Sequence, residues 1–132
     1  TNFTAVYRLI RSLEPLLRAS DAGRVIHLTT SVATTPRAFW GVYAATKAGA
    51  EMLMKCWADE LESVKIRVAV LDPGRMRTQM RAQAYPGEDP EQNPHPSEIG
   101  PLVVELARGD LEPPLEVSFR EWKDGPGAAA LV

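Results

Sequence analysis

The sequence predicts an α/β fold built around a buried parallel sheet. Two short runs, 24–30 and 66–71, are almost continuously apolar, as expected of parallel strands that are covered on both faces. A long helical pattern, 42–62, separates them, which is the order of a strand, a crossover helix and a second strand. Serine and threonine follow the first run, and Pro73-Gly74 ends the second. Polar residues at such strand ends predict a ligand site at one edge of the sheet.

A first helix is predicted over Asn2–Ala19, ahead of the first strand. Its apolar residues are spaced three and four apart, which places them on one face of a helix. Pro15 lies within the pattern, and because proline removes a backbone donor we expect a bend or an early end there. The residues of this stripe are Phe3, Val6, Ile10, Leu13 and Leu17.

The helix predicted over 42–62 carries a second apolar stripe, which we expect to pack into the core. Cys56 lies among apolar neighbours, and its expected role is packing rather than chemistry. The residues of this stripe are Ala50, Leu53, Trp57 and Leu61.

The chain after the second strand becomes irregular. Residues 75–97 are rich in proline and glycine, which predicts a loop. A helix is predicted over 96–108, with Ser97 as its N-cap and Gly109 as its end. Residues 115–119 alternate between apolar and polar, which predicts a half-exposed strand at the sheet edge.

Tyr43 and Lys47 form the most chemically suggestive pair in the sequence. One helical turn separates them, so both lie on the same helix face. A tyrosine is a poor base near neutrality, since its ordinary pKa is about 10. A nearby ammonium favours the phenolate, so Lys47 is expected to lower the pKa of Tyr43 towards the range useful for acid/base catalysis. The pair alone is also common in ordinary helices, and its weight comes from the strand ends around it.

The ordered set of motifs resembles the C-terminal half of the short-chain dehydrogenase/reductase family, and within it a bacterial subgroup of oxidoreductases. This resemblance implies a Rossmann-like doubly wound parallel sheet, of which the chain holds the C-terminal half. Residues 1–120 are then part of one NAD(P)-binding domain, and residues 121–132 are a tail. The residues that carry the resemblance are Asn2, Ser31, the run Tyr43-Ala-Ala-Thr-Lys47, Pro73-Gly74 and Thr78.

The resemblance implies an oxidoreductase that uses NAD or NADP and transfers a hydride between the nicotinamide and an alcohol/carbonyl substrate. Tyr43 is implied as the acid/base. Lys47 is implied to lower the pKa of Tyr43 and to hold the nicotinamide ribose. Ser31 is implied to polarise the substrate oxygen, and Asn2 to anchor a proton-relaying water. Thr30 is a rival to Ser31, because its spacing to Tyr43 also lies within the family's range.

The resemblance also implies which residues bind the cofactor besides Tyr43 and Lys47. Pro73 and Gly74 are expected beside the nicotinamide, and Thr78 against its carboxamide. Glycine allows close backbone approach to a flat ligand, which gives this expectation a physical basis. The substrate is expected to be a small molecule, and the helices of such enzymes suggest a homo-oligomer, a dimer or a tetramer.

The glycine-rich turn that begins a complete enzyme of this family does not precede Asn2 in this sequence. We therefore expect the chain to be part of a longer protein. The alternatives are a truncated, catalytically inactive binding or regulatory module of the same fold, and an epimerase or dehydratase on the same scaffold.

Composition excludes several classes. The 132 residues are 45% hydrophobic and 24% charged, with a net charge of −2, which provides no basic surface for nucleic acid or an anionic membrane. A single cysteine suits a reducing compartment, and we expect a cytoplasmic protein without a membrane span. His95 has no Cys or His partner at ligand spacing, so no metal site is expected.

Overall fold

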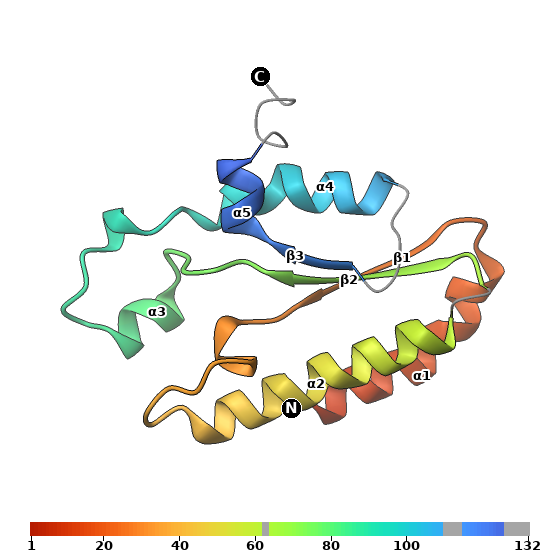
Figure 1. Cartoon of the computed structure of the whole chain (residues 1–132), viewed down its shortest axis with the longest axis horizontal. Helices are drawn as coiled ribbons and strands as arrows, with labels where there is room; N and C mark the ends of the chain where they lie inside the picture. The colour runs from red at the N-terminus through yellow and green to blue at the C-terminus, as the bar shows by residue number, and fades with distance from the viewer. Residues whose placement is uncertain (62–63, 110–114, 126–132) are drawn as a thin grey trace.

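The computed structural model, which describes residues 1–61, 64–109 and 115–125, contains a parallel three-stranded sheet with helices on both faces (Figure 1). The strands are β1 (Gly23–Leu28), β2 (Ile66–Asp72) and β3 (Leu115–Ser118), in the spatial order β1-β2-β3. Both neighbouring pairs are parallel. This confirms the predicted α/β fold with a parallel sheet.

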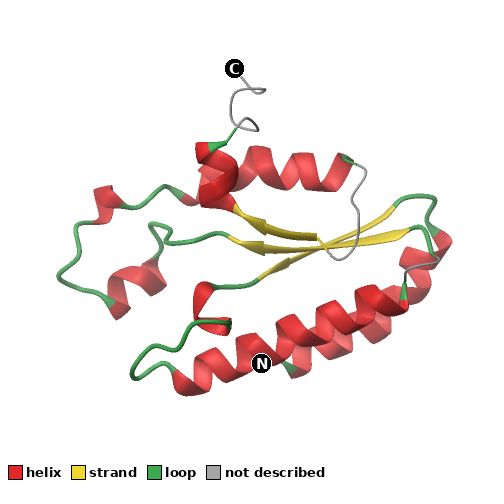
Figure 2. Cartoon of the chain, in the orientation of Figure 1, coloured by secondary structure: helices red, strands yellow, loops and turns green. Residues whose placement is uncertain are grey.

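The helices divide between the two faces of the sheet (Figure 2). Helices α1 (Thr4–Ala19) and α2 (Gly41–Glu60) cover one face. Helices α4 (Gly100–Arg108) and α5 (Phe119–Asp124) lie on the other. The short helix α3 (Gln79–Ala84) lies beyond the carboxyl end of β2. Three 3-10 turns complete the described elements: η1 (Ser31–Ala33), η2 (Pro90–Gln92) and η3 (Pro96–Ile99).

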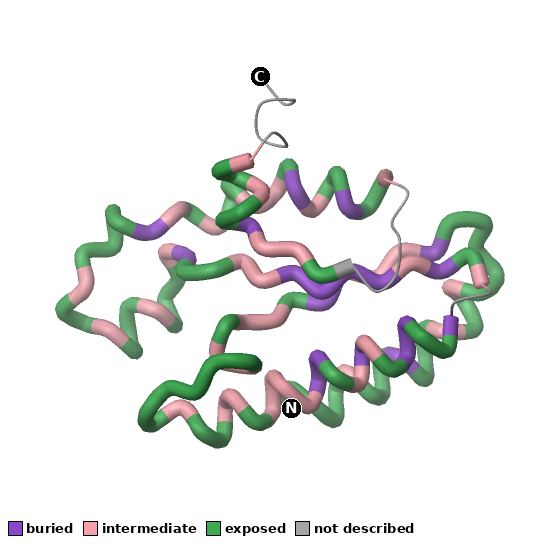
Figure 3. The backbone as a smooth tube through the Cα atoms, in the orientation of Figure 1, coloured by how far each residue is buried: buried purple, intermediate pink, exposed green. Residues whose placement is uncertain are grey.

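Strand β2 is buried along most of its length (Figure 3), and its side chains contribute to two separate cores. Val68 and Val70 pack with the buried residues of α1 and α2. Ala69 and Leu71 face the opposite way and pack with α4 and α5. Alternate side chains of a strand point to opposite faces, so a strand buried on both faces is almost wholly apolar. The central position of β2 therefore explains the apolar run that predicted it.

Helix α2 buries most of its predicted stripe. Ala50, Trp57 and Leu61 are buried, and Leu53 is partly buried against the same core. The expectation for Cys56 is wrong, because its side chain is exposed.

Helix α1 continues through Pro15 and ends at Ala19, so its predicted end is confirmed and only the alternative of an early end is wrong. The bend expected at Pro15 stays a prediction. The predicted extent of the first strand, 24–30, is corrected. Strand β1 ends at Leu28, and only Gly23 and His27 are buried in it. The described sheet places β1 at an edge, which leaves its side chains less covered than those of β2.

The loop predicted over 75–97 contains regular structure, since α3 forms within it. The prediction that Ser97 caps the following helix is also wrong. The His95 side chain accepts a hydrogen bond from the Ser97 N–H, and Glu98 accepts one from the His95 N–H. The α-helical part then runs to Arg108 and is followed by Gly109, as predicted. Helix α5 was not predicted, and residues 126–132 of the predicted tail lie outside the described residues.

Candidate active site

The carboxyl end of β1 carries the two hydroxyl groups considered for the substrate oxygen. The Thr29 N–H donates to Leu71 O over 2.9 Å, which extends the contact with β2. The backbone stays extended at Thr30, with φ −163°, and turns into η1 at Ser31. Thr30 is partly buried and Ser31 is exposed, and both line one groove. The choice between the two hydroxyls therefore stays open.

Tyr43 lies in the first turn of α2 and its ring is held by a neighbour. Trp40 meets it edge to face, with ring centroids 5.5 Å apart and an interplanar angle of 72°. Tyr43 is partly buried, and burial raises the pKa of its phenol. Burial disfavours the charged phenolate, so the side chain is a neutral proton donor near neutrality.

Lys47 does not have the effect on Tyr43 that the sequence suggested. Its Nζ donates to the carbonyl oxygen of Leu28 over 3.0 Å, at the end of β1. Burial lowers the pKa of Lys47 and raises that of Tyr43. The expected lowering of the pKa of Tyr43 is corrected for this reason: desolvation of the phenol decides its direction.

Asn2 lies behind Tyr43 and outside the groove. Its Nδ2 donates to Thr46 Oγ1 over 3.5 Å, and that hydroxyl donates to Tyr43 O over 2.8 Å. Asn2 therefore contacts the helix turn that carries Tyr43 through one intervening side chain. Its predicted role with a water molecule stays a prediction.

The end of β2 turns sharply beside β1. Gly74 has φ +68°, a conformation that glycine adopts without the steric cost that other residues meet. Its N–H donates to Asp72 Oδ1 over 2.9 Å. Thr78 follows as the N-cap of α3, where its hydroxyl accepts from the Arg81 N–H over 3.2 Å. The turn thus exposes backbone at the same sheet edge as Ser31.

A groove of about 1050 Å³ joins these strand ends. It brings together most of the residues singled out in the sequence, from the β1 end, the start of α2 and the β2 end. Lys47 and Asn2 are not part of its lining, although Leu28, the acceptor of Lys47, is. The sequence-predicted residues that line the groove are Thr30, Ser31, Tyr43, Pro73, Gly74 and Thr78.

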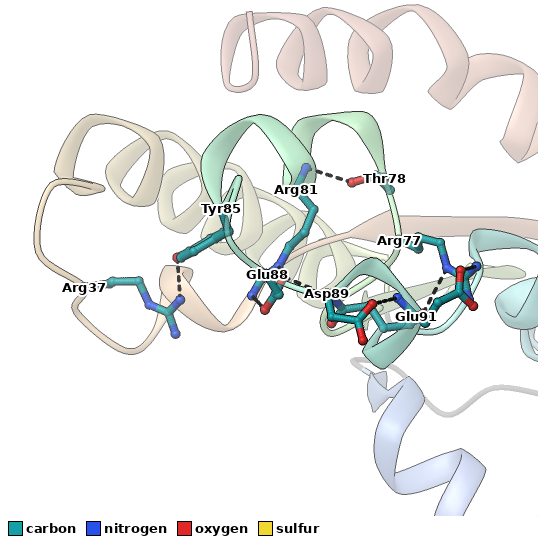
Figure 4. Close-up of polar contacts among 9 residues, drawn as sticks. Arg37, Arg77, Thr78, Arg81, Tyr85, Glu88, Asp89 and Glu91 are labelled. Atoms are coloured by element: carbon teal, nitrogen blue, oxygen red, sulfur yellow. Dashed lines mark hydrogen bonds and ion pairs between the residues drawn. The ribbon is translucent and has the colours of Figure 1, made fainter.

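A cluster that the sequence did not predict also lines the groove, and Figure 4 shows its polar contacts. Tyr85 stacks on Trp40, with centroids 6.1 Å apart, and accepts a hydrogen bond from Arg37 Nη1 over 2.8 Å. Arg81 lies 4.1 Å from the centre of the Tyr85 ring and holds both oxygens of Glu88, at 2.6 and 2.7 Å. Arg81 is therefore held between an aromatic ring and a carboxylate.

A second missed cluster connects α2 to the sheet. Thr29 Oγ1 donates to the buried Glu51, and Lys55 Nζ lies 2.8 Å from the other oxygen of Glu51. Lys55 also pairs with Glu116 on β3. One turn of helix separates Glu51 from Lys55, a spacing that favours such pairs, but only the structure places Thr29 and Glu116 beside them.

Two negative findings concern the described part of the chain. Within residues 1–61, 64–109 and 115–125, no group of three or more His, Cys, Asp or Glu side chains is placed to hold a metal ion. None of the helices in those ranges is both long and apolar enough to span a membrane.

Comparison with known proteins gives a consistent result. The family model for short chain dehydrogenases matches residues 1–89. The oxidoreductase YciK of Escherichia coli strain K12 is 42% identical over 109 residues, which cover 83% of this chain and 43% of that protein. The chain thus spans about half the length of the relatives it matches.

Solved structures agree with this similarity. A short chain dehydrogenase from Salmonella enterica serovar Typhi strain CT18 has a TM-score of 0.83 and 38% identity, covering 89% of this chain and 49% of that one. A short chain dehydrogenase from Escherichia coli CFT073, solved as a complex with NADPH, has a TM-score of 0.82 and 39% identity, with the same coverage. The parallel sheet and its helices therefore match a Rossmann-like fold in these proteins.

Proposed function

Because the chain belongs to the short chain dehydrogenase family, we propose that it supplies the acid/base half of an NAD(P)-dependent oxidoreductase acting on an alcohol/carbonyl pair. The observation that carries this proposal is the groove, whose lining includes Tyr43, the hydroxyls of the β1 end and the turn at the β2 end. The second support is the NADPH complex of a structural neighbour. The cofactor is NADP or NAD, and its chemistry when bound is the transfer of a hydride.

The residues present fit such a cofactor. A Cβ placed on Gly74 would meet nothing within 4 Å, so the turn borders open space at the groove. An ammonium has three donors, and Lys47 uses one of them on Leu28 O, which leaves donors for ribose hydroxyls. Pro73 and Gly74 would hold the nicotinamide ring, and Thr78 would meet its carboxamide.

Tyr43 performs the proton transfer in this proposal. Because burial raises the pKa of its phenol, Tyr43 is protonated near neutrality and donates a proton to the substrate oxygen during carbonyl reduction. Ser31, or Thr30 in its place, donates a hydrogen bond to the same oxygen and stabilises the charge that develops there. Asn2 and Thr46 hold the helix turn behind Tyr43.

The test uses the protein together with the cofactor-binding segment that the family places ahead of this region. The Tyr43→Phe variant removes the acidic hydroxyl and keeps the ring that packs on Trp40. Loss of general acid catalysis is expected to lower the rate of NADPH-dependent aldehyde reduction by about 10²–10⁴-fold. Tyr7→Phe, on the exposed side of α1, is the matched control and should leave the rate unchanged. Equal rates in both variants would refute the role of Tyr43.

The exposed apolar side chains of α1 support a homo-oligomer, a dimer or a tetramer. Leu9, Leu13 and Leu16 are exposed on this helix, and Leu16 is 68% exposed. Exposed Met52 adds apolar surface on α2. Contiguous apolar surface of this kind is typical of protein interfaces. We therefore propose that α1 and α2 contact a second copy of the chain.

A further inference from the structure

We propose that the substrate of this site carries an anionic group, a carboxylate or a phosphate, which Arg75 and Arg120 bind. The proposal rests on the proposed function, because it concerns the substrate of the groove that contains Tyr43. Both arginines line that groove and both are exposed within it.

The sheet brings these two arginines together from distant parts of the sequence. Asp72 in β2 and Ser118 in β3 are Cα partners in the parallel register. Arg75 follows Asp72 in the connection to α3, and Arg120 follows Ser118 in the first turn of α5. Their backbones therefore leave neighbouring strand ends at the same edge, where open α/β sheets bind ligands.

Other arginines near this edge already have partners (Figure 4). Arg81 holds both carboxylate oxygens of Glu88, and Arg37 donates to the Tyr85 hydroxyl. Arg77 pairs with Glu91 over 2.7 Å. Among the residues that the structure describes, neither Arg75 nor Arg120 makes a hydrogen bond or an ion pair. Arg75 and Arg120, which follow the strand ends and line the groove, are thus the arginines of its lining that remain available.

In the described part of the chain, none of the three carboxylates of the groove lining forms an ion pair with either arginine. Glu88 accepts a hydrogen bond from Asn93 Nδ2 over 3.0 Å in addition to its two bonds from Arg81, so its oxygens are occupied. Arg75 contributes to the low pKa of Glu88 only through a longer-range attraction. Asp72 accepts the Gly74 N–H through Oδ1. Asp124 is the third carboxylate of the lining. The cationic side chains of the lining are Arg37, Arg75, Arg81, Arg120 and Lys123.

A bound anion would provide the partner that Arg75 and Arg120 lack among the described residues. Guanidinium groups bind carboxylate and phosphate through planar, charge-assisted hydrogen bonds. A bound anion also reduces the repulsion between like charges at one edge of the groove. The anion could belong to the substrate or to a phosphate of the cofactor, and the two sources share this chemistry. We assign it to the substrate, because the same groove contains the hydroxyl of Tyr43 and the hydroxyls of the β1 end.

The experiment compares a charged and a neutral probe of similar shape. Benzoate and benzamide are titrated by calorimetry into the protein that includes the cofactor-binding segment, saturated with NADPH. The variants are Arg75→Gln, Arg120→Gln and their combination, and Arg108→Gln, in the exposed last turn of α4 and outside the groove, is the control with the same change in charge. Reduction of 4-carboxybenzaldehyde and 4-formylbenzamide is measured in the same variants, together with the Kd for NADPH.

We expect benzoate to bind about tenfold more tightly than benzamide, because charge-assisted hydrogen bonds exceed neutral ones in strength. Each single variant should reduce this preference severalfold and the double variant should abolish it. Arg108→Gln should leave the preference unchanged, and the Kd for NADPH should be the same in all variants. The KM for 4-carboxybenzaldehyde should rise in the same order, with the KM for 4-formylbenzamide unchanged.

Three results would overturn the proposal. Benzoate that binds no more tightly than benzamide, including no detectable binding of either, is the first. A variant that weakens both probes equally would indicate a structural role for the arginine. A variant that weakens NADPH instead would assign the anion to the cofactor. Charge-selective binding without reduction of either aldehyde would count against hydride transfer and leave the anion site standing, so the two proposals fail separately.

Discussion

The stack of Trp40 on Tyr85 predicts a measurable coupling free energy between the loop before α2 and helix α3. The rings lie 6.1 Å apart at 14°, and Trp40 also contacts Tyr43 at 5.5 Å. An aromatic pair contributes about 0.5–1.5 kcal/mol beyond the burial of its surface. Both rings are partly exposed, so we expect a value of about 0.5–1 kcal/mol for Trp40 with Tyr85.

A double-mutant cycle on the free energy of unfolding measures this coupling. Trp40→Leu, Tyr85→Leu and the double variant keep an apolar side chain and remove the ring, and urea denaturation gives the three free-energy changes. Tyr85→Leu also removes the hydrogen bond from Arg37, so Tyr85→Phe is measured as well to give the cost of that bond alone. If the two single changes add to the double change within about 0.3 kcal/mol, the rings are not coupled and the reasoning is refuted.

Three further predictions concern the turn, the α3 segment and the exposed helix. Gly74→Ala should lower the free energy of unfolding by about 1–2 kcal/mol, because φ is +68° at this position. Gly87→Ala is the control, since Gly87 has open space around it and no positive φ, and it should not lower the stability. Thermal unfolding compares the two variants. Hydrogen bonds from Arg81, the largest cause, hold the pKa of Glu88 at about 2. Since this folded-state pKa lies below the ordinary value of 4.5, the stabilisation is complete above pH 4.5 and is lost as the pH falls towards 2. The protection factors of the α3 amides, which correct for the intrinsic pH dependence of exchange, should therefore fall over that range, and a Glu88→Gln variant that retains the same pH response would contradict this assignment. Leu16→Glu should reduce the mass measured by light scattering if α1 contacts a second copy, and an unchanged mass would remove α1 from the interface.

The sequence predicted the central elements well for a physical reason. The run 66–71 is apolar because β2 is covered by helices on both faces, and a strand buried on both faces has an almost unbroken run of apolar residues. The stripe of α2 was readable because Ala50, Trp57 and Leu61 repeat with the helical period. Composition and periodicity record burial, so they predict the elements that are most buried.

The parts that escaped prediction depend on contacts rather than on periodicity. Helix α3 is only six residues long and is followed by a proline-rich loop, so its pattern is too short to detect. The pairing of Arg81 with Glu88 crosses the end of that helix, and no local spacing rule marks it. The cap at His95 was not predicted, because histidine is not among the strongly preferred N-cap residues and Ser97 is.

The same limit applies to the candidate site. The groove contains Ser31, Tyr43 and Gly74, which motif order predicted together. The direction in which the pKa of Tyr43 shifts was not predictable from the sequence, because it depends on how deeply the phenol is buried.

The bond from Lys47 to the Leu28 carbonyl has a consequence for how variants of this lysine are interpreted. This hydrogen bond connects α2 to the final residue of β1, so Lys47 stabilises the contact between a helix and a strand and is also a candidate cofactor ligand. A Lys47→Met variant therefore loses both the hydrogen bond to the Leu28 carbonyl and the positive charge. Its rate should be read beside its melting temperature, and beside that of Lys47→Arg, which keeps a cation able to reach the carbonyl.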